Sequence, residues 1–169
     1  MSVEVRRVRP GEWAELKALR LRALEDTPDA FASTLAEESG LPDRHWRRDA
    51  REAANGAEVF VALAVDGATD RLAGLVRGAA WRGEPAIAGV FSMWVDPDLR
   101  GRGIGGALLA SVTTWAKAGG YRRLRLHVVE TNREAVALYG RAGFAATGVR
   151  EPLREGSDLV LTMMERDLS

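Results

Sequence analysis

The segment from residue 95 to residue 109 reads as the end of a strand, a glycine-dense turn and the first turns of an apolar helix. Four glycines fall within six positions of this turn, namely Gly101, Gly103, Gly105 and Gly106. Because glycine has no Cβ, the backbone N–H groups of such a turn can approach a ligand closely and point at it together. The first turn of the helix adds unpaired N–H groups and the positive end of its dipole. The segment therefore predicts a cradle for an anion, most simply a phosphate group.

Two arginines beside these glycines favour the same prediction. Arg100 and Arg102 bracket Gly101, and arginine donates charge-assisted hydrogen bonds to phosphate oxygens. A plain structural turn between a strand and a helix is the alternative interpretation of any glycine-rich loop. We expect phosphate binding because the glycines and the arginines occur together.

The same glycines, spaced Gly101-x-Gly103-x-x-Gly106, also fit the dinucleotide-binding pattern. That pattern requires an acidic residue about 20 residues later, at the end of the next strand. The next predicted strand carries Arg and His on its polar face, and Glu130 is the only acid nearby. The phosphate-loop pattern that ends in Gly-Lys-Ser/Thr is absent. The surroundings of the turn therefore argue against a dinucleotide-binding unit.

Hydrophobic periodicity divides the chain into helices and strands. Helices are predicted at Pro10 to Leu24, at Asp43 to Ala54, from the glycine turn to Gly119-Gly120, and at Asn132 to Ala142. Strands are predicted at Val3 to Val8, Val59 to Val65, Leu72 to Ala80, Ala86 to Val95, Arg123 to Val129, Ala145 to Val149 and Leu159 to Arg166. This order indicates an α/β fold with a mixed, mostly antiparallel sheet and helices on both faces.

Composition limits the classes of protein that fit. The chain has 169 residues, 46% hydrophobic and 28% charged, which is typical of one globular domain, here residues 1–169. Its 24 basic and 24 acidic side chains balance, so no nucleic-acid partner is expected. No run approaches the roughly 18 apolar residues of a membrane span, and no signal-peptide core is evident, so we expect a cytoplasmic protein without a membrane partner. With no cysteine and only His45 and His127, no metal site is expected.

Two blocks of the sequence resemble the GNAT acyltransferase superfamily. The family signature Arg/Gln-x-x-Gly-x-Gly/Ala is matched at every fixed position by Arg100 to Gly105. The second block runs from Leu126 to Tyr139, followed by Gly143-Phe144, in the family's order and spacing. The resemblance implies a fold in which the fourth and fifth strands, Ala86 to Val95 and Arg123 to Val129, splay apart to admit an acyl-CoA. A homodimer is also possible on this resemblance.

The resemblance also implies where acetyl-CoA, the acyl-donor cosubstrate, binds. Its pyrophosphate would lie on the N–H groups of the cradle, that is, of Arg100, Gly101, Arg102, Gly103, Ile104 and Gly105. Its pantetheine arm would pair with the backbone of Met93 and Val95 like an extra strand. A backbone N–H of the fourth strand would polarise the thioester carbonyl. Asn132 fits a helix cap and a coenzyme contact equally well.

For catalysis, Tyr139 matches the family's tyrosine that protonates the departing thiolate, and a phenol remains protonated at neutral pH. By position alone it also fits a core aromatic of a helix. His127 is the candidate general base, because imidazole accepts a proton near neutral pH; a polar residue on an uncovered strand face is the alternative. Glu130, Glu84 and Glu37 are rival candidates for the base. Because the chain has no cysteine, we expect direct transfer without an acyl-enzyme.

These observations predict an N-acetyltransferase that moves an acetyl group from acetyl-CoA to a primary amine of a small molecule or peptide. The alternative is a non-catalytic acyl-CoA-binding sensor on the same fold. Residues 27–43 and 151–157 are expected to select the acceptor, because loops carry specificity in such a scaffold. Glu37, Glu38 and Asp43 could attract a cationic amine, and a solvated loop explains them equally well.

Overall fold

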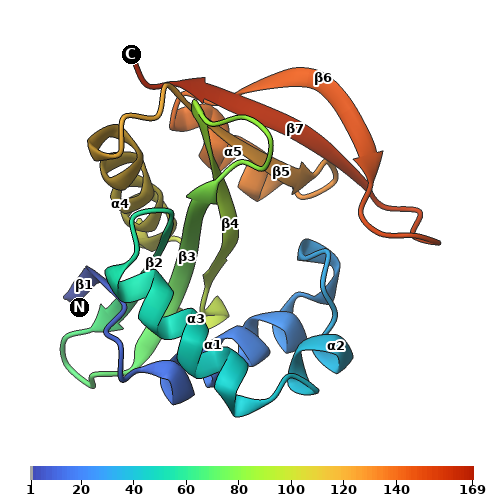
Figure 1. The fold of residues 1–169 in the computed structure, drawn as a ribbon. Coiled ribbons are helices and arrows are strands. Elements are labelled where there is room, and N and C mark those ends of the chain that lie inside the picture. Colours follow the sequence, from blue (N-terminus) through green and yellow to red (C-terminus); the bar gives the residue numbers. More distant parts are fainter. Residues whose placement is uncertain (1) are drawn as a thin grey trace.

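The structure is a computed structural model that describes residues 2–169, arranged as one seven-stranded sheet with helices on both faces (Figure 1). The strands are β1 (Val3–Arg7), β2 (Val59–Asp66), β3 (Leu72–Ala80), β4 (Ile87–Val95), β5 (Arg123–Val129), β6 (Ala145–Pro152) and β7 (Val160–Asp167). The helices are α1 (Trp13–Asp26), α2 (Leu35–Ser39), α3 (Asp43–Asn55), α4 (Ile104–Ala118) and α5 (Arg133–Arg141), with short 3-10 turns at Pro28–Ala30 and Pro97–Leu99. The strand order is β1-β2-β3-β4-β5-β7-β6, and only β4 and β5 pair in parallel. The predicted fold class is confirmed.

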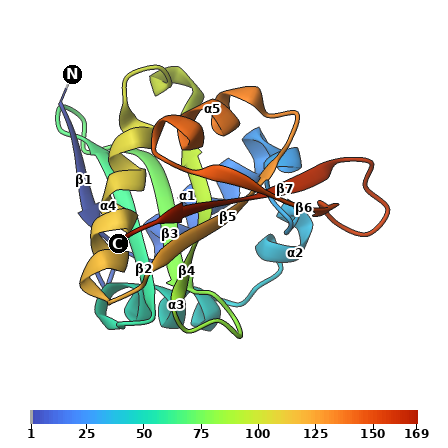
Figure 2. The ribbon, with the colours of Figure 1, turned by 90° about the horizontal axis from the view of Figure 1, so that it is seen from above.

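Alternating side chains along the central strands divide the core between the two faces of the sheet. In β2, Val61 packs into the cluster shared with α1 and α3, whereas Ala62 packs into the cluster shared with α4, as a side-chain period of two requires. The helix α4 lies so close to β3 that a Cβ on Gly78 would come within 2.8 Å of the Trp115 ring. Figure 2 shows α4 on one side of the sheet and α1 on the other.

The parallel strands β4 and β5 separate after a short paired stretch. They pair only at Ile87 with Arg123, Ala88 with Leu124 and Gly89 with Arg125. Beyond that stretch β4 bulges: Ser92 has a φ of +57°, and the β3–β4 register shifts between Leu75 and Arg77. A bulge bends its strand and re-aims the local backbone. The predicted splay is confirmed, and the edge of β4 that faces β5 is left without a strand partner beyond Gly89.

The two segments expected to select an acceptor lie side by side. The turn between β6 and β7 projects beyond the sheet toward α2 (Figures 1 and 2). There the Arg154 side chain donates hydrogen bonds to the carbonyl oxygens of Phe31 (2.7 Å) and Pro28 (3.0 Å). Segments more than a hundred residues apart therefore form one wall beside the splayed strands.

Three local predictions differ from the structure. The first helix begins at Trp13, because the N–H of Glu12 bonds the Arg9 carbonyl in a turn before the helix. The helix α2 was not predicted, although Thr34 and Glu37 form a capping box at its start. The strand β6 extends to Pro152, since it pairs with β7 beyond Val149. No helix within residues 2–169 has the length and apolar character of a membrane span, and a homodimer stays a prediction.

Candidate functional site

The glycine turn between β4 and α4 presents backbone rather than side chains. Gly101 and Gly103 have φ values of +78° and +82°, and a Cβ at either position would meet nothing within 4 Å. Gly103 is the N-cap of α4, and the first helical bond runs from the Ala107 N–H to its carbonyl at 3.1 Å. The N–H groups of Ile104 and Gly105 precede that bond, so the helix does not use them. This left-handed turn is the backbone arrangement that an anion cradle requires.

A buried carboxylate fixes the entry to this turn. Asp96 is only 1% exposed, and its carboxylate accepts hydrogen bonds from Arg22 of α1 at 2.5 Å and from Arg71 at 2.6 Å. The same side chain caps the 3-10 turn by accepting the Asp98 N–H at 3.0 Å. Sequence reasoning missed Asp96, because its partners are remote in the chain. The signal that was available is an Asp immediately before Pro97, which is typical of a turn start.

The Arg100 side chain links the turn to β4 and α1. Its Nε donates to the Val95 carbonyl at 2.9 Å and its Nη2 donates to Asp26 at 2.7 Å. Asp26 also accepts the indole N–H of Trp94 at 3.0 Å. Two donors of the Arg100 guanidinium are therefore engaged by β4 and by Asp26 of α1, and its contact with a phosphate stays a prediction. The Val95 carbonyl is likewise occupied, which leaves its N–H for the predicted pantetheine pairing.

A cavity of about 450 Å³ lies where β4 and β5 separate. Four of the predicted site residues line it: Met93 of β4, His127 of β5, Asn132 at the N-cap of α5, and Tyr139 of α5. Asn132 caps α5 by accepting the Ala135 N–H at 3.2 Å. Leu138 lines the cavity, and a Cβ on Gly105 would lie 3.2 Å from it. The cavity therefore abuts the first turn of α4 and the glycine turn before it.

Tyr139 is buried in the cavity wall. Its ring meets the edge of Phe144 with the two centroids 5.8 Å apart. Burial raises the pKa of the Tyr139 phenol to about 12, because the anionic form would lose its hydration. The hydroxyl therefore carries its proton throughout the neutral range and can donate it to a developing anion.

His127 also lines this cavity, and its two ring nitrogens have different surroundings. The Nδ1 atom is 3.4 Å from a carboxylate oxygen of Glu151 on β6, and the ring meets the edge of Trp81 at 5.4 Å. The Nε2 atom is buried and has no hydrogen-bond partner among residues 2–169. A carboxylate beside Nδ1 favours the tautomer with its proton there, which leaves the Nε2 lone pair free.

The rival carboxylates hold the fold together instead. Glu130 accepts two hydrogen bonds from Arg150, at 2.6 and 2.9 Å, and this pairing lowers the pKa of Glu130. Glu84 forms a close ion pair with Arg125. Glu37 accepts the Thr34 N–H at 2.9 Å in the capping box of α2. None of the three lines the cavity between β4 and β5.

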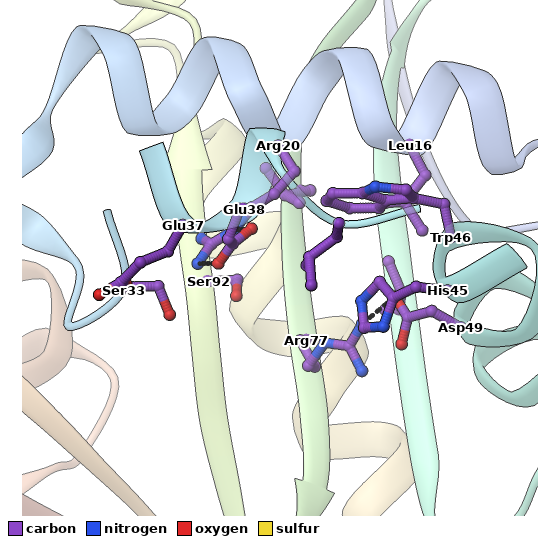
Figure 3. Close-up of a pocket in the computed structure, with 13 residues that line it drawn as sticks. Leu16, Arg20, Ser33, Glu37, Glu38, His45, Trp46, Asp49, Arg77 and Ser92 are labelled. Carbon is purple, nitrogen blue, oxygen red and sulfur yellow. Dashed lines mark hydrogen bonds and ion pairs between the residues drawn. The ribbon is translucent and has the colours of Figure 1, made fainter. Parts of the chain in front are cut away.

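A second cavity, of about 470 Å³, lies between α1, α2, α3 and the sheet (Figure 3). Figure 3 shows Arg20 with Glu38 on one side of it and Arg77 with Asp49 on the other. The two cavities share four lining residues, namely Arg20, Ser33, Arg77 and Ser92. Sequence reasoning missed this junction, although an arginine within the apolar strand Leu72–Ala80 was a signal that could have found Arg77.

The three acids predicted to attract a cationic amine are all engaged within the protein. Glu38 pairs with Arg20 at 2.8 Å, Asp43 pairs with Lys17 at 3.1 Å, and Glu37 caps α2. Only Glu37 and Glu38 line a cavity. The charges of this loop are therefore largely balanced by internal partners.

Comparison with known proteins gives consistent matches. Residues 18–144 match the acetyltransferase (GNAT) family. A mycothiol acetyltransferase of Salinispora arenicola is 36% identical over 155 residues, which cover 85% of this chain and 45% of that protein. The chain thus spans about half the length of the curated relatives it matches. An acetyltransferase of the GNAT family from Streptococcus pneumoniae superposes with a TM-score of 0.83 at 24% identity, over 99% of this chain and 100% of that one. A phosphinothricin acetyltransferase of Sinorhizobium meliloti in complex with acetyl-CoA superposes with a TM-score of 0.79 at 20% identity, over 100% of this chain and 90% of that one.

Proposed function

Because the chain belongs to the acetyltransferase (GNAT) family, we propose that it transfers an acetyl group from acetyl-CoA directly to a primary amine of a small molecule or peptide. The observation that carries this proposal is the cavity at the unpaired edge of β4, which is lined both by a buried, protonated Tyr139 and by His127. A module that only binds acyl-CoA would need neither a proton donor nor a proton acceptor in that cavity.

The residues present fit acetyl-CoA at the glycine turn and along β4. The turn from Arg100 to Gly105 offers N–H groups and no Cβ at Gly101 and Gly103, which suits a pyrophosphate. The N–H of Asp96 bonds the Ala73 carbonyl of β3, and successive residues of a strand point their backbone groups to opposite sides. Val95 and Met93 therefore turn theirs toward the gap, where an extended pantetheine arm would pair with them. The thioester supplies the activated acyl group.

The bulge in β4 is where the acyl carbonyl would be polarised. Ser92 and Met93 stand opposite the single residue Val76 of β3, between the pairs Arg77 with Phe91 and Leu75 with Trp94. A bulge frees backbone groups from the ladder. An N–H at this point would donate to the carbonyl oxygen and stabilise the oxyanion, an interaction worth about 3 kcal/mol elsewhere.

Two side chains would move the protons. His127 would accept a proton from the acceptor ammonium at Nε2, directly or through a water, while Glu151 keeps the other ring proton on Nδ1. The amine nitrogen then bonds the acyl carbon as the carbon–sulfur bond breaks, and this nitrogen releases its second proton to solvent to give the neutral amide. Tyr139 would donate its proton to the departing thiolate and regain one from solvent. Asn132, which caps α5, would help to position the coenzyme arm.

The experiment that tests the proposal measures release of free coenzyme A thiol from acetyl-CoA by the purified chain. The acceptor panel holds amino acids, polyamines, aminoglycosides and short peptides. Release that depends on an acceptor supports the proposal. Acetyl-CoA that raises the melting temperature, with no acceptor consumed from the panel, supports a sensor instead. Absence of any acetyl-CoA binding overturns both.

A further inference from the structure

The two cavities meet at a wall that is rich in hydrogen-bond donors. This wall, here called the junction, consists of Arg20, Ser33, Arg77 and Ser92. Arg20 comes from α1, Ser33 from the segment before α2, Arg77 from β3 and Ser92 from the bulge of β4. An acceptor that enters between the helices must pass the junction to reach the cavity that holds Tyr139 and His127.

Arg20 is held on one side only. Its Nε and Nη2 donate to the Glu38 carboxylate at 2.9 and 2.8 Å, and its guanidinium stacks over the Phe31 ring at 4.6 Å. Its side chain is 12% exposed. The remaining nitrogen, Nη1, is buried and has no partner among the described residues. A buried donor without a partner costs free energy, and a ligand oxygen would remove that cost.

Arg77 repeats this arrangement on the other side of the cavity. One of its terminal nitrogens forms a close ion pair with Asp49 of α3, as Figure 3 shows. Within residues 2–169 its other guanidinium N–H groups make no further hydrogen bond, and neither do the hydroxyls of Ser33 and Ser92. Two guanidiniums are thus oriented from behind by carboxylates while their remaining donors stay available.

From this we propose that the acceptor is an α-amino acid, whose carboxylate binds at the junction between Arg20 and Arg77. The inference rests on the proposed acetyltransferase function and names its substrate class. Each guanidinium charge is already balanced by Glu38 or Asp49, so the junction offers hydrogen bonds without an excess of positive charge. That balance favours a singly charged carboxylate over a doubly charged phosphate.

The rest of such a molecule fits the two cavities. Its amine, one carbon from the carboxylate, would lie at Ser92 and point into the cavity of His127, which no described acidic residue lines. Its side chain would occupy the cavity of Figure 3, where Leu16, Leu41 and Leu75 provide an apolar wall. Glu37, Glu38 and Asp49 line the same cavity, so it accommodates a side chain that combines apolar carbon with a polar group.

The test compares each α-amino acid with its carboxamide and its decarboxylated amine, as acceptors for the full chain with acetyl-CoA. Phosphoethanolamine and β-alanine are added to separate phosphate from carboxylate recognition. We expect kcat/KM to be at least about tenfold higher for the free acid, because hydrogen bonds to a charged group discriminate by this factor or more. Equal kcat/KM for acid and amine, or a preference for phosphoethanolamine, would overturn the inference while leaving the acetyltransferase proposal intact.

The matched variants are Arg77→Gln at the junction and Arg82→Gln, which makes the same change at an exposed hairpin residue outside both cavities. Arg77→Gln should remove the preference for the free acid and raise its KM, with the KM for acetyl-CoA unchanged. Arg82→Gln should keep the preference. A separate binding experiment measures how far amino acids and their carboxamides raise the melting temperature of the protein in the presence of coenzyme A. Acid-selective shifts that Arg77→Gln abolishes support the carboxylate site even if turnover is absent, and shifts that are equal for both overturn it.

Discussion

Replacing Gly103 by alanine tests whether the glycine turn binds the coenzyme, because the expected loss of stability is small and the expected loss of coenzyme A affinity is large. An L-residue in the left-handed region costs about 1–2 kcal/mol, and the φ of Gly103 is +82°. Alanine recovers about 0.4–1 kcal/mol by restricting the unfolded chain, so the net loss of unfolding free energy is at most about 1.6 kcal/mol, with a midpoint of about 0.8 kcal/mol. For a chain of this size the midpoint lowers the melting temperature by roughly 2–3 °C, and the maximum lowers it by roughly 6 °C. Because the new Cβ meets no protein atom within 4 Å, no clash adds to this loss.

Gly120 provides the matched control. Its φ is +78°, a Cβ there also meets nothing within 4 Å, and it lies beyond the far end of α4. Gly120→Ala should therefore lose similar stability. Only Gly103→Ala should weaken coenzyme A binding, by at least about tenfold, because its Cβ enters the space where the pyrophosphate would approach the backbone.

The assay is isothermal titration with coenzyme A beside thermal unfolding of both variants. Gly103→Glu adds a stronger arm, in which a negative charge at the cradle should abolish binding. Unchanged coenzyme A affinity in Gly103→Ala, with the expected drop in melting temperature, would refute the cradle. Equal affinity losses in Gly103→Ala and Gly120→Ala would show that strain, rather than the cradle, controls binding.

Tyr139→Phe should lower kcat by about 10²-fold or more with coenzyme A affinity unchanged, since only the proton donor is lost; a near-normal kcat in steady-state assays would exclude this role. The wild-type free energy of unfolding should fall by about 1.9 kcal/mol as pH rises from 10 to 12, because the unfolded phenol ionises near 10 while burial holds the folded pKa of Tyr139 at about 12. Urea titrations at both pH values should find this fall missing in Tyr139→Phe. Asp96→Ala should lower the free energy of unfolding, measured in urea, by about 2–3 kcal/mol, and Arg71→Ala should lower it by less than about 1 kcal/mol. The reason is that the Asp96 carboxylate is buried, whereas each of its arginine partners is substantially exposed. Equal losses in the two variants would contradict this account. His127→Gln should lower kcat about 10²-fold, and Glu151→Gln should lower it less. The double variant should have the kcat of His127→Gln alone. If the two losses in kcat are additive instead, Glu151 does not act through His127.

The sequence alone determined the elements whose signals are local. Residues 100–105 carry their own turn chemistry, because positive φ values select glycine and a helix follows at once. The periodic spacing of apolar residues in β4 and α4 predicted the strand before the turn and the helix after it. The spacing from Asn132 to Tyr139 predicted a helix that Asn132 caps and that carries Tyr139. These signals sufficed for the fold and for one wall of the cavity.

Only the tertiary structure shows which side chains of those elements form contacts and which residues are their partners. Arg100 looked like a phosphate ligand in sequence, and only the approach of α1 shows that Asp26 holds its guanidinium. The partners Glu151 for His127 and Arg22 for Asp96 are far apart in the chain. Such contacts depend on how sheet and helices pack, and no period or motif of a single segment encodes them. The junction of Arg20 and Arg77 likewise exists only because α1, β3 and the bulge of β4 meet there, so the proposed acceptor site depends on the packed fold.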